Sequence, residues 1–146
     1  EAQKSFHQCL KLDQKHCFSL FRLGQIEENN GYLERAWKYY QKAQQTKEGE
    51  KLAPRHLARV AYKRGEQEKA REYLHEALVY NPKDAYALNL LARIYLESGD
   101  DPEVAETLAR QSVSLKPDIA SFWEVLARSL EVQGKTEQAR KARARV

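Results

Sequence analysis

Glycine recurs along this chain at intervals of 34, 34 and 35 residues, at Gly31, Gly65, Gly99 and Gly134. An alanine follows each of them by five or six residues, at Ala36, Ala70, Ala105 and Ala139. A period of this length is typical of a helix-turn-helix unit that cannot bury its own apolar face and therefore stacks on the next unit. The spacing predicts an all-α chain of repeated helix pairs, with an extended binding surface instead of an enclosed active-site pocket.

Two further columns appear when the glycines are placed in register. A leucine and a small residue precede each glycine by eight and seven positions, at Leu23-Gly24, Leu57-Ala58, Leu91-Ala92 and Leu126-Ala127. A small residue at a helix contact lets two helices approach closely, so this column predicts the packing face of each first helix. Pro82 and Pro117 are expected to end second helices, with Asp84 and Asp118 capping the helices that follow.

These columns resemble those of the tetratricopeptide repeat family over the whole chain. Trp123, Leu126, Tyr95, Tyr40 and Pro82 fill slots that the family uses, although no repeat fills all of them. The resemblance implies a right-handed superhelical solenoid of antiparallel helix pairs, forming a single domain over residues 1–146. We expect full repeats at 17–50, 51–84 and 85–119 and a C-terminal repeat at 120–146.

Residues 1–16 match the second helix of a repeat whose first helix is missing. We therefore expect the chain to be part of a longer array. An orphan helix would leave Phe6 and Leu10 uncovered, and such an apolar patch favours self-association.

One face of each predicted first helix is free to bind a partner, because the leucine and its small neighbour face the second helix. The predicted partner-binding residues on this face are Phe18, Phe21, Arg22, Arg55, His56, Arg59, Tyr62, Tyr86, Asn89, Arg93 and Arg128. Arg59, Arg93 and Arg128 share one column of the repeat. Arginine pairs with carboxylates in a bidentate geometry and is common at interaction hot spots. The column predicts a protein scaffold that binds an acidic peptide or helix in its concave groove.

The composition sets limits on other functions. A net charge of +4 with 32% charged residues is a mild basic excess, which disfavours a nucleic-acid partner. The longest apolar stretch, 85–96, is interrupted by Asn89 and Arg93, so we expect no insertion into a membrane. The chain has no methionine and no charged-then-apolar leader, so it could be an excised piece whose targeting signal is not visible. The compartment therefore stays open from the sequence, with the cytoplasm favoured.

The sequence offers no pattern typical of catalysis, a cofactor or a metal, and we expect none of the three. His7, Cys9, His16 and Cys17 match no metal-ligand spacing, so we interpret Cys9 as packed and Cys17 as a loop residue. Paired acids occur only as neighbours, for example Glu27-Glu28, whereas acid catalysis needs carboxylates that face each other across a cleft.

Two alternatives remain open from the sequence. The chain could be the recruiting extension of a larger enzyme whose catalytic part lies outside these residues. More remotely, it could be a helical-repeat protein that binds RNA, although its first-helix face lacks the regular pairs of polar side chains that select one base per repeat. Binding of chaperone tails is disfavoured, because Gln25, His56 and Tyr86 occupy slots where the family's carboxylate clamp has asparagine and lysine.

Overall fold

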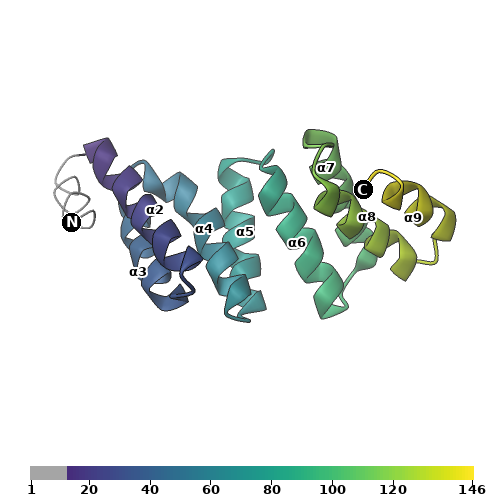
Figure 1. The fold of residues 1–146 in the computed structure, drawn as a ribbon, viewed down its shortest axis with the longest axis horizontal. Helices are drawn as coiled ribbons and strands as arrows, with labels where there is room; N and C mark the ends of the chain where they lie inside the picture. Colours follow the sequence, from purple (N-terminus) through teal and green to yellow (C-terminus); the bar gives the residue numbers. More distant parts are fainter. Residues whose placement is uncertain (1–12) are drawn as a thin grey trace. The chain divides into compact units, whose positions relative to one another are not determined.

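Residues 13–146 form eight helices in the computed structural model, which describes this part of the chain and its side chains from residue 16 onward. They are α2 (Asp13–Asn29), α3 (Leu33–Gln44), α4 (Gly49–Lys63), α5 (Gln67–Tyr80), α6 (Ala85–Ser98), α7 (Pro102–Leu115), α8 (Ala120–Val132) and α9 (Thr136–Arg143). Short turns join α2 to α3, α4 to α5, α6 to α7 and α8 to α9, and each pair packs side by side (Figure 1). The described residues contain no strand, and the predicted all-α fold of helix pairs is confirmed.

The chain divides into two compact units between Tyr80 and Asn81. Helices α2 to α5 belong to the first unit and α6 to α9 to the second. The helix predicted over residues 1–16, with Phe6 and Leu10 as its apolar side, lies almost entirely outside the described residues. Helix α2 begins at Asp13, four residues before the repeat boundary predicted at residue 17.

The four periodic glycines lie in the turns between paired helices, as the sequence predicts. Their φ angles lie between 72° and 84°, a left-handed conformation that side chains with a Cβ disfavour. Gly99 shows the role most directly, because it ends α6 and donates its N–H to the carbonyl of Leu96. A helix can therefore stop and reverse at the same position in every repeat.

Of the two aspartates predicted to cap helices, Asp84 is confirmed and Asp118 is not, and Asp101 is a cap that was not predicted. The Asp84 side chain accepts the N–H of Ala87 at 3.2 Å and caps α6, and Asp101 caps α7 with Pro102 in the first turn. Asp118 was expected to cap the next helix, and this is wrong. The N-cap of α8 is Ile119, which has no side-chain hydrogen bond, because the helix begins at Ala120.

The leucine and small-residue columns form the core of both units. Leu23, Leu57, Leu91 and Leu126, and the alanine beside each of the last three, are at most 2% exposed, and the alanines after the turns are equally buried. Cys17 was expected in a loop, and this is also wrong. It lies on α2 and is 3% exposed, so it packs as a small apolar residue.

Gly24 is matched to one large neighbour, which gives a testable prediction. A Cβ at Gly24 would lie 2.8 Å from Cδ1 of Tyr40, whose side chain is fully buried. The next repeat has Ala58 and the smaller Leu74 at the corresponding positions. We expect Gly24→Ala to lower the free energy of unfolding by about 1–3 kcal/mol in urea titrations, although alanine favours helix. An unchanged or increased value would contradict the tight fit, and the double variant Gly24→Ala/Tyr40→Leu is expected to remove the steric part of the loss.

Candidate functional site

The predicted binding residues fall into two groups, one in each compact unit. Helices α2 and α4 of the first unit carry Phe18, Phe21, Arg22, Arg55, His56, Arg59 and Tyr62. Helices α6 and α8 of the second unit carry Tyr86, Asn89, Arg93 and Arg128. We describe each group by itself.

The first group surrounds a buried carboxylate, Glu28, near the end of α2. Glu28 accepts hydrogen bonds from Arg59 at 2.6 and 2.8 Å, from Lys63 at 2.6 Å and from the Tyr40 hydroxyl at 2.8 Å. Only 3% of the Glu28 side chain is exposed, compared with 34% for Arg59 and 44% for Lys63. The carboxylate therefore joins α2, α3 and α4 through one network.

The pKa values of this network follow from burial and pairing. Burial alone raises the pKa of Glu28, but the hydrogen bonds from Arg59 and Lys63 outweigh it and bring the pKa down to about 2. Burial, and then the bond to Glu28, raises the pKa of Tyr40. Burial lowers the pKa of Arg59, but the carboxylate partner reverses this and raises it. Glu28 is thus ionised and Tyr40 neutral at neutral pH.

Arg59 was predicted to offer its planar fork to a partner, and the structure places that fork on a carboxylate of its own chain. Both Nε and Nη2 donate to Glu28, a bidentate arrangement that satisfies the guanidinium strongly. A contact between Arg59 and a partner stays a prediction. The observed role of Arg59 is to hold α4 against α2.

His56 lies against two aromatic rings beside this network. Its ring centroid is 4.9 Å from that of Phe21 and 5.0 Å from that of Tyr40, and Arg59 Nη2 lies 3.0 Å from its Nδ1. A guanidinium can only donate, so Nδ1 accepts and the imidazole carries its proton on Nε2. Burial, then the charges of Arg59 and Arg55, lower the pKa of His56 to about 3. The ring is neutral and acts as a packed acceptor.

The other predicted residues of the first unit differ in exposure. Phe18 is 69% exposed and Arg22, one turn later on α2, is exposed as well. Phe21, Arg55 and Tyr62 are half-buried. An exposed phenylalanine next to an arginine offers an apolar contact and a charge to a partner.

In the second unit, Tyr86 and Asn89 lie one turn apart on α6. Tyr86 is 51% exposed, and its ring packs edge-on against Phe122 of α8, with centroids 5.5 Å apart. Asn89 is only 7% exposed, and its Oδ1 has no hydrogen-bond partner among the described residues. A buried amide oxygen without a donor costs about 1–3 kcal/mol, so a ligand N–H at this position would be stabilising.

Arg93 of α6 and Arg128 of α8 keep their charge unpaired. Arg93 is half-buried and Arg128 exposed, and the guanidinium of neither forms a hydrogen bond or ion pair with another described residue of the second unit. The acids one turn to either side of Arg128 are Glu124 and Glu131, and both bind Arg143 of α9 instead. Because α6 packs on α8, the second unit presents two unneutralised guanidinium groups on adjacent first helices.

The sequence interpretation missed Glu28, Tyr40 and Lys63 as members of the first group. A signal for them exists in the repeat register. Glu28 lies 31 residues before Arg59, whereas the residue 31 positions before Arg93 is Tyr62, which is not an acid. The offset of 31 residues is therefore a signal for the counter-ion of Arg59, but it is not a general rule, because the residue 31 positions before Arg128 is also an acid, Glu97.

The described residues hold neither a metal cluster nor a membrane-spanning helix. Within the described residues, no three or more histidine, cysteine, aspartate or glutamate side chains gather where they could hold a metal ion. His7 and Cys9, two of the four candidates considered from the sequence, lie outside those residues. None of the described helices combines the length and apolar character that spanning a membrane requires.

Comparison with known proteins identifies the family. Two models of the tetratricopeptide repeat match the chain, one over residues 61–129 and the other over 19–49. The chain belongs to the tetratricopeptide repeat family. It is also 31% identical to the photosystem I assembly protein Ycf3 of Cyanophora paradoxa, in an alignment that covers 71% of this chain and 69% of that protein. The family resemblance inferred from the glycine and alanine columns is thereby confirmed.

Solved structures share the fold of this repeat protein. A crystal structure of MamA superposes with a TM-score of 0.80 at 20% identity, covering 97% of this chain and 82% of MamA. MamA 41-end from Desulfovibrio magneticus RS-1 gives a TM-score of 0.73 at 20% identity, covering 86% of this chain and 71% of that one. At this identity the likeness shows a common tetratricopeptide repeat fold.

Proposed function

We propose that this chain is a non-catalytic scaffold that holds another protein on the first-helix face of its repeats, and that the second unit binds an acidic, extended peptide at Arg93 and Arg128. Membership of the tetratricopeptide repeat family supports a role in protein interaction, and the name of its relative Ycf3 describes an assembly protein. The observation that carries the proposal is the pair of arginines without a counter-ion on α6 and α8.

The chemistry of this face fits a peptide with carboxylate side chains. Arg93 and Arg128 each offer a fork that pairs with a carboxylate in two parallel hydrogen bonds. The unpaired Oδ1 of Asn89 suits a backbone N–H, and the exposed ring of Tyr86 suits an apolar side chain. An extended peptide presents all three groups in alternation, with side chains pointing to opposite sides.

The first unit contributes differently to the proposed scaffold. Phe18 and Arg22 are its exposed candidates for contact with a partner, while Phe21 and His56 pack over the Glu28 network. We propose that Arg59 acts mainly as a positioning residue here, because its fork binds Glu28. Arg59 would then influence partner binding by holding α4 in place.

Charge reversal at Arg93 and Arg128 tests the proposal. Peptides that bind the intact chain are first selected from a displayed library, and their affinities are then measured by fluorescence polarisation. The double variant Arg93→Glu/Arg128→Glu is expected to weaken binding of acidic peptides by at least about tenfold, because each charge-assisted bond contributes about 1.5–3 kcal/mol.

A matched control is Arg140→Glu, since Arg140 is exposed and pairs only with Glu137 on its own helix. This variant changes net charge in the same direction and is expected to leave affinity within about twofold. A selection without acidic peptides, or an equal loss in both variants, would contradict the proposed site.

A further inference from the structure

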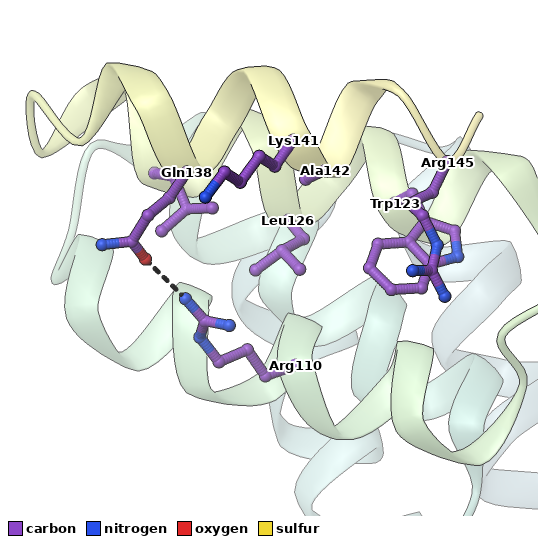
Figure 2. Close-up of a pocket in the computed structure, with 8 residues that line it drawn as sticks. Arg110, Trp123, Leu126, Gln138, Lys141, Ala142 and Arg145 are labelled. Atoms are coloured by element: carbon purple, nitrogen blue, oxygen red, sulfur yellow. Dashed lines mark hydrogen bonds between the residues drawn. The ribbon is translucent and has the colours of Figure 1, made fainter.

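A second surface of the second unit lies between its second helices, α7 and α9. A hollow of about 240 Å³ is lined there by Arg110, Trp123, Leu126, Leu130, Gln138, Lys141, Ala142 and Arg145. Figure 2 shows Gln138, Lys141 and Ala142 along one side of α9 and Arg145 just after its end. Arg110 lies opposite them on α7, and Leu126 and Trp123 of α8 lie between them. The floor is apolar and the rim carries three cations.

A second hollow adjoins the first on the same unit. It has a volume of about 400 Å³ and is lined by Pro82, Lys83, Leu88, Arg110, Gln111, Ser114 and Leu115. Arg110 lines both hollows, so they meet at this residue of α7. Leu88 lies 35 positions before Trp123, so both hollows have a large apolar residue at the same place in the repeat. Neither hollow is lined by an acidic residue among those that the structure describes.

The cations of α9 and of the turn that follows it divide into two classes. Arg140 pairs with Glu137, and Arg143 pairs with Glu124 and Glu131 of α8. Lys141 and Arg145 face the hollow and form no ion pair with any of residues 16–146. Arg145 instead lies over the ring of Trp123, with Cζ 4.8 Å from the ring centre. The positive charge of this segment is therefore neutralised at Arg140 and Arg143 and left unneutralised at Lys141 and Arg145, which line the hollow.

The positive charge on the opposite rim, at Arg110, is partly neutralised. Arg110 donates to Glu106 at 2.7 Å and to Gln138 at 3.0 Å, and the second of these bonds links α7 to α9 across the hollow. Glu106 also accepts hydrogen bonds from Lys135 and Gln133. Burial alone raises the pKa of Glu106, but the hydrogen bonds from Lys135, Arg110 and Gln133 outweigh it and bring the pKa down to about 2. One hydrogen bond thus crosses the hollow, and its unneutralised charge lies at Lys141 and Arg145.

We propose that these two hollows form a second docking surface, distinct from the first-helix face, for an acidic segment of another protein. An aliphatic side chain of the segment packs on Trp123, Leu126 and Ala142, and its carboxylates pair with Lys141 and Arg145. The same segment continues past Arg110 toward Lys83. A chain that holds one partner on its first helices and another here can bring two proteins together.

The lining favours a protein segment over a nucleic acid. Single-stranded nucleic acid binds where successive aromatic rings stack with its bases, and this surface has one aromatic ring beside an aliphatic floor. Acidic side chains that alternate with leucine match both the charge and the apolar floor.

The test measures fluorescein-labelled peptides against the intact chain. The probe is Asp-Glu-Leu-Glu-Glu-Leu-Asp-Glu, and its controls replace leucine by alanine or glutamate and aspartate by their amides. We expect the probe to bind, and both controls to bind at least about tenfold more weakly. In a Trp37→Phe background, which leaves Trp123 as the one tryptophan of the chain, the probe should change the fluorescence of Trp123.

Variants locate the binding. Lys141→Glu/Arg145→Glu is expected to weaken binding of the probe at least about tenfold, and the milder Lys141→Ala/Arg145→Ala severalfold. Both variants should keep the far-ultraviolet circular dichroism of the unchanged chain, which shows that they fold. Arg140→Glu, on the same helix, and Arg93→Glu/Arg128→Glu, on the first-helix face, should stay within about twofold. Arg93→Glu/Arg128→Glu tests the first-helix face alone, so the second surface and the proposed function can be contradicted independently.

Four results would overturn the second surface. The first is that the probe does not bind, and the second is that Arg140→Glu and Lys141→Glu/Arg145→Glu lose affinity equally. The third is that a single-stranded oligonucleotide binds more strongly than the probe and that Lys141→Glu/Arg145→Glu abolishes this binding. The fourth is that the chain sediments as a dimer and that Lys141→Glu/Arg145→Glu dissociates it. The third result would assign the surface to nucleic acid, and the fourth to a second copy of this chain.

Discussion

Replacing Glu28 with alanine is expected to lower the free energy of unfolding by about 3–5 kcal/mol, the largest effect of any single substitution predicted for this chain. Glu28 is 3% exposed and accepts from Arg59, Lys63 and Tyr40. Its removal leaves the Arg59 guanidinium without its counter-charge and a buried hydroxyl without its acceptor. Three helices lose the group that joins them.

Urea denaturation measures this loss, with Trp37 of α3 as the fluorescent reporter in a Trp123→Phe background. Glu137→Ala is the matched control, because Glu137 also accepts from an arginine at 2.6 Å but is 64% exposed, and its loss should cost less than about 1 kcal/mol. The double variant Glu28→Ala/Arg59→Ala should cost less than the sum of the two single variants. Similar losses for Glu28→Ala and Glu137→Ala would show that burial does not strengthen the network.

The sequence predicted those parts of the fold that depend on local geometry. A glycine is needed wherever the chain reverses with a positive φ, so its period marked every turn between paired helices. The buried leucine and alanine columns followed from the contact between two helices, which repeats with the same spacing. Asp84 was identified as a cap because its interaction partner, Ala87, lies only three residues away.

Features that depend on residues far apart in the chain were not predicted. Helical spacing placed Arg59 on a first-helix face, but its counter-ion is 31 residues earlier and its second neighbour, Tyr40, belongs to a third helix. The same limit applies to Arg128, whose lack of a counter-ion depends on Arg143 binding Glu124 and Glu131. Cys17 was misplaced because α2 begins at Asp13, earlier than the repeat register implied.

Acidification is expected to destabilise the first unit through His56 before any carboxylate of the network is protonated. The pKa of His56 is about 3 in the folded chain against an ordinary value of 6.5. Between these values the unfolded chain binds more protons than the folded one, so the free energy of unfolding falls as pH falls. The groups around the ring are Glu28 of α2, Tyr40 of α3, and Arg55 and Arg59 of α4, and the two arginines disfavour a second cation.

The contributions of His56 and Glu28 to the free energy of unfolding change in different ranges of pH. The pKa of Glu28 is about 2 when folded and 4.5 ordinarily, so its stabilising contribution is present above 4.5 and is lost as pH falls toward 2. Between pH 6.5 and 4.5 the loss of free energy of unfolding therefore comes from His56 and should reach about 2 kcal/mol, at up to about 1.4 kcal/mol per pH unit.

His56→Gln keeps an acceptor for Arg59 and should remove this loss from urea titrations repeated across the window. The control His75→Gln changes an exposed histidine and should retain it. If His56→Gln keeps the full dependence on pH, the imidazole is not the group that destabilises the folded unit in acid.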